Sequence, residues 1–339
     1  MKKTKVVHFT SVHPFGDVRV FHKECVSLVD AGYEVSHIVP NAESGTFDGV
    51  QVISIYYKHS SRLDRMRKTT KLVYQKCLEV DADIYHFHDP ELLRVGLKLK
   101  RKGKKVIYDV HEDVTRQILS KSYINGFIRR IVAFSVERLE NYVSKRLDVI
   151  ITDTPFINDR FLKINKNSVN FNNFPMINEI EVKESHDLVR ENRVCYIGVL
   201  SFIRGVNEMV EAVGIADIDF QLAGTWQPGV KEKVSKIKGW DKVEDLGFIS
   251  RSTSLEVKSK CIAGLVLFLP EPNHVNAQPN KLLEYMASGL PVIASNFPLW
   301  KAIIEDNDCG LCVEAHDSKA IAEAITYLND NPEREEEMG

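Results

Sequence analysis

The chain has 339 residues, of which 44% are hydrophobic and 27% are charged, a composition typical of a globular protein with about two domains. No run of about 18 apolar residues is present, and the N-terminal sequence lacks the apolar segment and cleavage site of a signal peptide. We therefore expect a cytoplasmic protein without a membrane-spanning helix, and we expect no nucleic acid among its partners.

Short apolar runs alternate with helical patterns in the first half of the chain. The expected helices are residues 20–31, 62–80 and 91–100. The expected strands are residues 6–10, 34–39, 50–56, 84–88, 105–110 and 149–152. Continuous apolar strands separated by helices indicate a parallel sheet that is covered on both faces.

The alternation is interrupted over residues 154–192, which contain Pro155, the sequence Asn172-Asn173-Phe174-Pro175 and a polar run. It then resumes, with strands expected at residues 194–199, 219–223, 243–248, 264–268, 292–295 and 310–313. We therefore expect an α/β protein with two Rossmann-like domains, residues 1–165 and 193–339, joined by a linker region at 166–192. Two parallel sheets facing each other would form a cleft at the carboxyl ends of their strands, where open α/β sheets bind ligands.

Charge is distributed unevenly along the chain. Residues 1–190 hold 31 Lys and Arg against 24 Asp and Glu, whereas residues 191–339 hold 14 against 23. Within the basic half, the segment 123–131 places Arg129 and Arg130 beside Phe127 and Ile128. This combination suits an anionic membrane surface, although a solvated helical face gives the same pattern.

The six cysteines are scattered and mostly have apolar neighbours, so we expect buried, reduced thiols. Cys309 and Cys312 have the spacing of zinc ligands, but the sequence contains no second pair. We therefore expect no zinc site there.

The segment 279–295 predicts a short helix at Asn280–Ser288, a stop at Gly289 and a buried strand at 291–295. The first turn of a helix has unpaired N–H groups, and with Lys281 these suit a diphosphate. Glu284 suits a vicinal diol, because a carboxylate accepts two hydrogen bonds. Diphosphate and diol together describe a sugar nucleotide. An ordinary amphipathic helix packed on a sheet has the same spacing.

A second candidate for phosphate binding is the loop Gly198–Gly205, which is expected to connect a strand to a helix. Glycines let backbone amides approach a phosphate closely, and the guanidinium of Arg204 can bond two oxygens. A surface arginine that caps a turn is the alternative. The loop at 271–278, with His274 and Asn276, precedes the predicted helix at 280–288. It is a further candidate for hydrogen bonding to the sugar, although a plain connecting loop is the alternative.

His86 and His88 end an expected strand and are two residues apart, so they share one face of the sheet while Phe87 lies on the other. Three interpretations remain open for this pair: contact with a substrate sugar, packed core histidines, or a metal site completed by Asp89, as in hydrolases.

Several of these motifs together resemble the retaining glycosyltransferases of family 4. Glu284 stands at the second Glu of their Glu-x7-Glu element, followed by Ala287, Gly289, Pro291 and Val292, while Asn276 replaces the first Glu. In the glycine loop Arg204 matches the family's Lys, and Val199 replaces its Arg. The sequence from Asp17 to Glu24, Asp-x-Arg-x-Phe-x-Lys-Glu, and the segment Asp109-Val-His-Glu-Asp113 resemble a bacterial polysaccharide branch of the family.

The resemblance implies a GT-B fold and a set of site residues. It implies catalytic roles for His88, against the transferred sugar, and for Asp17, which would position the acceptor hydroxyl. Donor binding is expected of Gly16, Arg204, Asn276, Lys281 and Glu284, and the acceptor side is expected to include Arg19, His111 and Glu112. No metal or other cofactor is implied.

The resemblance also implies transfer of a sugar, with retention of the α configuration, from a UDP-sugar to a saccharide linked to undecaprenyl diphosphate. The expected location is the cytoplasmic face of the inner membrane, in O-antigen or capsule assembly, and we favour α-1,3 transfer of N-acetylgalactosamine. Alternatives are an enzyme like UDP-N-acetylglucosamine 2-epimerase, a metal-dependent hydrolase using His86, His88 and Asp89, and a non-catalytic sugar-nucleotide sensor.

Overall fold

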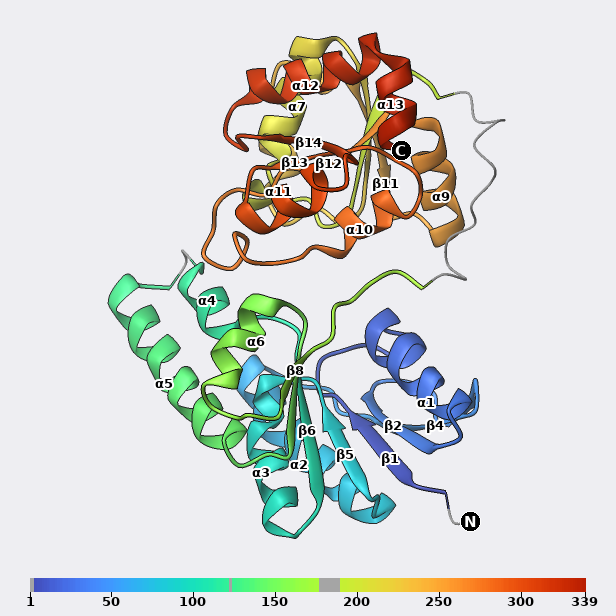
Figure 1. Cartoon of the computed structure of the whole chain (residues 1–339). Helices are drawn as coiled ribbons and strands as arrows, with labels where there is room; N and C mark the ends of the chain where they lie inside the picture. Colours follow the sequence, from blue (N-terminus) through green and yellow to red (C-terminus); the bar gives the residue numbers. More distant parts are fainter. Residues whose placement is uncertain (1–2, 122–123, 177–189) are drawn as a thin grey trace. The chain divides into compact units, whose positions relative to one another are not determined.

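The computed structural model describes residues 3–121, 124–176 and 190–339, which form two compact units, residues 1–173 and 174–339 (Figure 1). Each unit has its own sheet and its own hydrophobic core, and each is considered separately below. Most of the predicted linker, residues 177–189, lies outside the described residues. Among the described residues, no helix combines the length and apolar character needed to cross a bilayer.

The first unit is built on an eight-stranded sheet with the strand order β3-β4-β2-β1-β5-β6-β7-β8, parallel except at β3. Its strands are β1 (Lys5–Phe9), β2 (Glu34–Pro40), β3 (Gly45–Phe47), β4 (Val50–Ile55), β5 (Ile84–Phe87), β6 (Lys105–Val110), β7 (Val149–Thr152) and β8 (Ser168–Asn170). Its helices are η1 (Val18–Cys25), α1 (Val26–Asp30), α2 (Arg62–Val80), η2 (Pro90–Leu92), α3 (Leu93–Arg101), α4 (Val114–Leu119), α5 (Gly126–Ser144) and α6 (Pro155–Leu162).

Alternation along β1 separates the two faces of this sheet. Val7 and Phe9 are buried in a core shared with α2 and α3, whereas His8 lies on the opposite face, which η1 covers with Phe21 and Cys25. This alternation follows from the period of two along a strand.

The predicted helix at 20–31 forms as two pieces, the π-helix η1 followed by one turn of α-helix, α1. Asp17 begins η1, because its side chain accepts a hydrogen bond from the backbone N–H of Val20 at 3.0 Å. The strands β3 and β8 were not predicted. β8 pairs with β7 in parallel, so the first unit extends beyond residue 165, the predicted boundary, to Asn173.

The second unit is built on a six-stranded parallel sheet with the order β11-β10-β9-β12-β13-β14. Its strands are β9 (Arg193–Ile197), β10 (Asp219–Ala223), β11 (Val243–Gly247), β12 (Ala263–Val266), β13 (Val292–Ser295) and β14 (Gly310–Val313). Its helices are η5 (Phe202–Arg204), α7 (Val206–Ala216), α8 (Lys231–Val234), η6 (Trp240–Lys242), α9 (Arg251–Lys260), α10 (Asn280–Met286), α11 (Pro298–Glu305), α12 (Ser318–Asp330) and α13 (Pro332–Met338).

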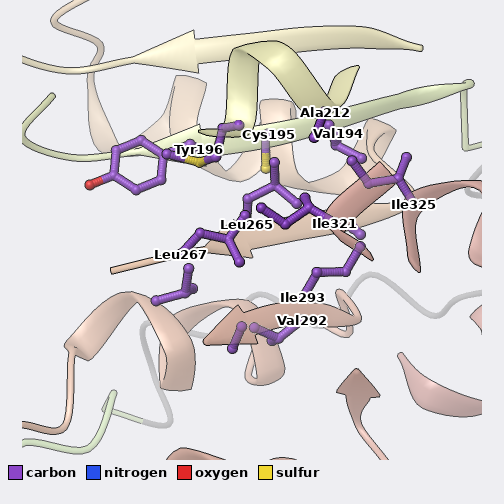
Figure 2. Close-up of a cluster of buried hydrophobic side chains, with 14 of the residues drawn as sticks. Val194, Cys195, Tyr196, Ala212, Leu265, Leu267, Val292, Ile293, Ile321 and Ile325 are labelled. Atoms are coloured by element: carbon purple, nitrogen blue, oxygen red, sulfur yellow. The ribbon is translucent and has the colours of Figure 1, made fainter. Parts of the chain in front are cut away.

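The core of the second unit lies between its sheet and its helices. Val194, Leu265 and Ile293, from the neighbouring strands β9, β12 and β13, pack with Ile321 and Ile325 of α12 (Figure 2). All five side chains are at most 1% exposed, and burial of each apolar side chain stabilises the fold by about 1.5–3 kcal/mol. The predicted helix at 280–288 forms as α10 and ends at Met286, two residues earlier than expected.

Candidate active site

In both sheets the strand order reverses beside a central strand, which is the point where open α/β sheets bind ligands. In the first unit β2 and β5 lie on opposite sides of β1, and in the second β10 and β12 lie on opposite sides of β9. The loops that follow β1, β5, β9 and β12 carry most of the predicted site residues. The two units therefore each present polar side chains at the carboxyl edge of the sheet.

The ends of β1 and β5 are joined through Asp89. Its Oδ2 accepts hydrogen bonds from Thr10 Oγ1 at 2.7 Å and from the Ser11 backbone N–H at 2.6 Å. Asp89 is buried, and its carboxylate is held by these donors. The alternative in which Asp89 joins His86 and His88 around a metal does not match this geometry, because the only grouping of metal-ligand atoms among the described residues that contains both histidines contains His8 and Glu24 instead.

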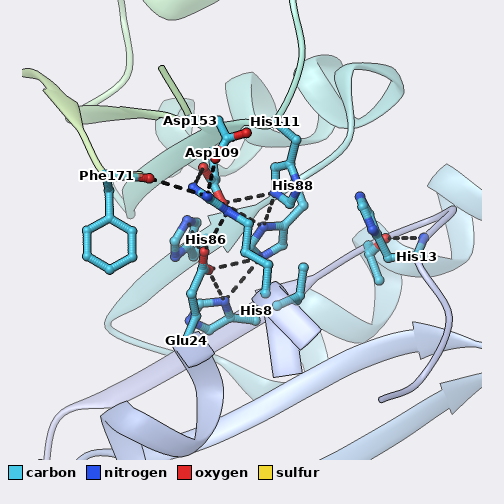
Figure 3. Close-up of polar contacts among 12 residues, drawn as sticks. His8, His13, Glu24, His86, His88, Asp109, His111, Asp153 and Phe171 are labelled. Carbon is cyan, nitrogen blue, oxygen red and sulfur yellow. Dashed lines mark hydrogen bonds and ion pairs between the residues drawn. The ribbon is translucent and has the colours of Figure 1, made fainter. Parts of the chain in front are cut away.

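Arg19 is buried, and its guanidinium contacts the carboxylates of Glu24, Asp109 and Asp153, which are labelled in Figure 3. Its guanidinium bonds both oxygens of Asp109, at 3.1 and 2.9 Å, and contacts Asp153 at 2.7 Å. Its Nε also lies 3.2 Å from Oε1 of Glu24. Burial tends to raise the pKa of Asp109, but His111, His88 and Arg19 hold it well below its usual range. Arg19, predicted for the acceptor side, thus lies in a network of ion pairs within the first unit.

His88, predicted to be catalytic, is buried, and both of its ring nitrogens have partners. Nδ1 lies 3.3 Å from Asp109 Oδ2 and 3.1 Å from His111 Nε2, and Nε2 lies 3.1 Å from His8 Nδ1. Burial lowers the pKa of His88 well below its usual value, so the imidazole is neutral near pH 7. No atom of the His88 side chain is exposed in this unit, and its contact with a sugar stays a prediction.

The more exposed imidazoles at this edge are those of His13 and His111, whose side chains are 25% and 17% exposed. His13 lies 3.2 Å from the Asp17 carboxylate. Burial opposes ionisation of Asp17, but the hydrogen bonds from His13 and from the Val20 amide lower its pKa well below the usual value. Gly16 has φ +79°, which a side chain rarely adopts, and Glu112 is exposed and bonds to Gln117.

In the second unit two predicted donor-binding cations lie close together. The Lys281 ammonium lies 3.9 Å from the centre of the Tyr196 ring and 5.4 Å from that of Phe268, and Arg204 lies 5.1 Å from the same Phe268 ring. A Cβ on Gly198 would come 2.5 Å from Lys281 Nζ, and side chains rarely adopt the φ of +150° found here, so glycine is favoured at this position. The loop after β9 and the start of α10 therefore form one site.

Lys281 Nζ is buried and has no hydrogen-bond acceptor among residues 3–121, 124–176 and 190–339. Burial, and then repulsion from Arg204, lower the pKa of Lys281 well below its usual value. A buried cation without an acceptor destabilises the fold. This arrangement becomes favourable when an anion enters the site.

The other donor-binding residues predicted in the second unit, Asn276 and Glu284, lie within five residues of Lys281 in the sequence. Glu284 lies on the exposed face of α10, and Asn276 is half-buried in the turn that precedes this helix. His274, also in the turn, is held by its own chain, because Nδ1 lies 3.0 Å from the Leu269 carbonyl oxygen.

Sequence reasoning missed three residues of the first unit's polar cluster: His8, Glu24 and Asp153. His8 reads as part of an apolar strand, and Asp153 follows an apolar strand without any motif. Pairing of β1 with β5 places His8 opposite His86, and pairing of β6 with β7 brings Asp153 near Asp109. The signal that was available is a polar residue within or directly after each of four expected strands.

Comparison with known proteins agrees with this geometry. Residues 16–169 match the model of Glycosyltransferase Family 4, and residues 178–339 match the model of Glycosyl transferases group 1. No curated protein matches the chain.

Among solved structures, sucrose-phosphate synthase from Thermosynechococcus elongatus is similar with a TM-score of 0.78 and 16% identity, over 99% of this chain and 92% of that chain. WaaG, a glycosyltransferase involved in lipopolysaccharide biosynthesis, has a TM-score of 0.74 and 15% identity, over 98% and 92%. HepE of Anabaena in complex with UDP-glucose has a TM-score of 0.71 and 16% identity, over 98% and 92%.

Each unit has an α/β sheet, parallel except at β3, with polar side chains at the carboxyl ends of its strands. Glycosyltransferase models match both halves of the chain. Together these observations define an enzyme of the GT-B class. The chain is a glycosyltransferase.

Proposed function

We propose that this glycosyltransferase moves a sugar from a UDP-sugar to a saccharide linked to undecaprenyl diphosphate, with retention of the α configuration. The observation that carries the proposal is the buried Lys281 ammonium, which lacks an acceptor among the described residues and lies beside Arg204 at the edge of the second sheet. The binding of UDP and UDP-glucose by HepE supports a uridine nucleotide as the donor.

The chemistry of the leaving group explains why two cations matter. Breaking the glycosyl–phosphate bond builds negative charge on the departing diphosphate. Lys281 and Arg204 would stabilise this charge more strongly in the transition state than in the ground state, without a metal at the diphosphate. A preorganised donor of this kind contributes about 3–4 kcal/mol to transition-state stabilisation. Retention then follows if the departing phosphate accepts the proton of the attacking hydroxyl on the same face.

Glu284 and Asn276 are proposed to hold the diol and the sugar hydroxyls of the donor. Substituting Glu284 by alanine is expected to raise KM for the UDP-sugar about 10-fold with a smaller effect on kcat, because a hydrogen bond to a charged group is worth about 1.5–3 kcal/mol. Initial rates over a range of donor concentrations measure this split. Glu305→Ala, at an exposed position of α11, is the matched control and should leave KM unchanged. An unchanged KM in Glu284→Ala would remove this residue from the donor site.

On the acceptor side we propose that Asp17, with His13 and His111, contacts the incoming hydroxyl, and that Gly16 and Glu112 lie in the same region. His88 and Arg19 are buried behind these groups. They are proposed to position His111 and Asp109 rather than to touch substrate.

For the substrate we favour UDP-N-acetylgalactosamine and an α-1,3 linkage in O-antigen or capsule assembly, and the similarity to WaaG supports a polysaccharide role. A panel of UDP-sugars with a synthetic lipid-diphosphate saccharide, followed by NMR of the product, tests the donor, the linkage and the anomeric configuration. Formation of a free sugar or an epimer without acceptor would instead favour a hydrolase or an epimerase.

A lipid-linked acceptor requires the enzyme to reach a membrane, and α5 is the proposed contact. Its first half exposes Phe127 by 74%, Ile131 by 50% and Phe134 by 58%, with Arg130 exposed among them. An exposed apolar face with interspersed arginines favours binding to anionic lipid. We therefore propose peripheral binding at the cytoplasmic face of the inner membrane.

The double variant Phe127→Ser/Phe134→Ser is expected to lose most of its binding to vesicles that contain phosphatidylglycerol, because two large apolar side chains no longer enter the interface. Flotation of the protein with vesicles measures the bound fraction. The control Phe248→Ser removes a phenylalanine that is 86% exposed in the second unit. Equal flotation of both variants and the wild type would contradict the role of α5.

A further inference from the structure

The first unit contains a group of four buried or half-buried metal-ligating side chains, which lies behind the residues proposed to contact the acceptor. His8 lies on β1, His86 lies on β5, and His88 directly follows β5 (Figure 3). Glu24 lies on η1, which covers this face of the sheet. The ligand atoms of all four residues lie within 4.8 Å of one another. We propose that these four side chains bind a divalent transition-metal ion, with Zn²⁺ as the favoured ion, and that the ion fastens η1 to the sheet.

The spacing of the four atoms fits a tetrahedral ion. Glu24 Oε2 lies 3.6 Å from His8 Nδ1 and 3.9 Å from both His86 Nε2 and His88 Nε2, and the His8 and His88 nitrogens are 3.1 Å apart. Ligands at about 2.0–2.1 Å from zinc stand about 3.3 Å apart at the corners of a tetrahedron. All four ligand atoms lie within 4.8 Å of one another, so the side chains would move closer together to enclose an ion.

Unpaired polar atoms inside the group indicate that a partner is needed. Within the described part of the chain, neither oxygen of Glu24 accepts a hydrogen bond, and His86 Nε2 has no hydrogen-bond partner. Buried polar atoms are nearly always hydrogen-bonded in folded proteins. Because Glu24 Oε1 already faces Arg19, one cation would provide the missing partner for Glu24 Oε2 and His86 Nε2.

The excess of negative charge around the group also favours a bound cation. Arg19 is a single cation in contact with three carboxylates, those of Glu24, Asp109 and Asp153. Buried charge of this kind is unfavourable unless it is compensated. A divalent ion beside Glu24 would balance the excess.

A neighbouring carboxylate orients one of the proposed histidine ligands. The Nδ1 of His88 faces Asp109, which in turn is fixed by Arg19. A carboxylate behind a histidine fixes its tautomer and directs Nε2 at the ion. Binding then requires His8 to carry its proton on Nε2.

A second group, His88, Asp109 and His111, is less suited to hold an ion. Both oxygens of Asp109 already bond to Arg19, and Oδ2 also lies 2.9 Å from His111. This group supports the four proposed ligands. Because the four are all protein side chains, the site is of the closed, structural kind rather than a catalytic one with an open position.

The test uses the full chain without an affinity tag that binds metal. Protein equilibrated with zinc and then dialysed against metal-free buffer is expected to retain about one equivalent of zinc by elemental analysis, and to melt at a higher temperature than chelator-treated protein. Cobalt substitution is expected to give the visible absorption of tetrahedral Co²⁺ without the near-ultraviolet band of cobalt bound to thiolate.

The variants Glu24→Gln and His86→Gln are expected to retain no zinc, whereas His316→Gln, at an exposed position of the second unit, should bind as the wild type does. If the ligand variants fail to fold, the cobalt spectrum of the wild-type protein decides. Absence of retained zinc together with a melting temperature that zinc does not change would overturn the proposal. A thiolate band that disappears in Cys309→Ser/Cys312→Ser would also overturn it.

Discussion

Substituting Lys281 by methionine is expected to lower kcat about 10²–10³-fold with the UDP-sugar donor, because one preorganised cation at the departing diphosphate is lost. The same substitution is expected to raise the melting temperature of the second unit, since it removes a buried charge that has no acceptor among the described residues. Opposite effects on activity and stability distinguish a cation that serves a ligand from one that serves the fold.

Both effects can be measured on one sample. All three tryptophans, Trp226, Trp240 and Trp300, lie in the second unit, so tryptophan fluorescence follows its unfolding. Lys301→Met, on the exposed side of α11, is the matched control and should change neither quantity. A destabilised Lys281→Met would show that the ammonium is paired within the protein.

Lys281 also predicts how donor binding depends on pH. Its pKa in the free protein is lowered by burial and by Arg204, and a bound diphosphate would raise it. Binding should therefore take up a proton at pH values between the free and the bound pKa, and affinity should fall as the pH rises. Titration calorimetry in buffers with different ionisation enthalpies measures the proton uptake.

Substituting Arg19 by methionine is expected to destabilise the first unit by about 3–5 kcal/mol, because Glu24, Asp109 and Asp153 lose their common cation while buried or half-buried. The melting temperature should fall on the order of 10 °C. The loss should shrink as the pH falls, since protonation neutralises the carboxylates that have lost their partner.

Circular dichroism detects unfolding of either unit, whereas tryptophan fluorescence detects only that of the second unit. An unfolding transition that appears in circular dichroism but not in tryptophan fluorescence therefore reports the first unit. The matched control is Arg67→Met, at an exposed position of α2 in the same unit. A melting temperature of Arg19→Met equal to that of the wild type would contradict this prediction. The three carboxylates would then be stabilised by something other than this guanidinium.

The sequence predicted the sheet strands well where apolar runs were continuous, and the period of two placed His86 and His88 on one face correctly. It also placed Arg204 and Lys281 in two segments that the structure brings together, because both follow strands at a point where the sheet order reverses. The three-residue strands β3 and β8 were missed, since neither carries a pattern long enough to detect.

The contact between Arg19 and Glu24 could not be predicted from helical periodicity. At about 3.6 residues per turn, residues five apart point in directions about 140° different. The structure places them 3.2 Å apart because η1 is a π-helix, in which hydrogen bonds join residues five apart. The polar cluster of the first unit thus depends on a local winding that propensities do not indicate.

The two edges of the eight-stranded sheet have a consequence for the behaviour of the protein at high concentration. Each edge is a strand of only three residues, β3 at one side and β8 at the other. Long exposed strands are templates on which chains add to one another and aggregate. Such short borders offer few backbone groups to a neighbouring molecule, so overproduction of the enzyme should not cause edge-to-edge polymerisation of this sheet.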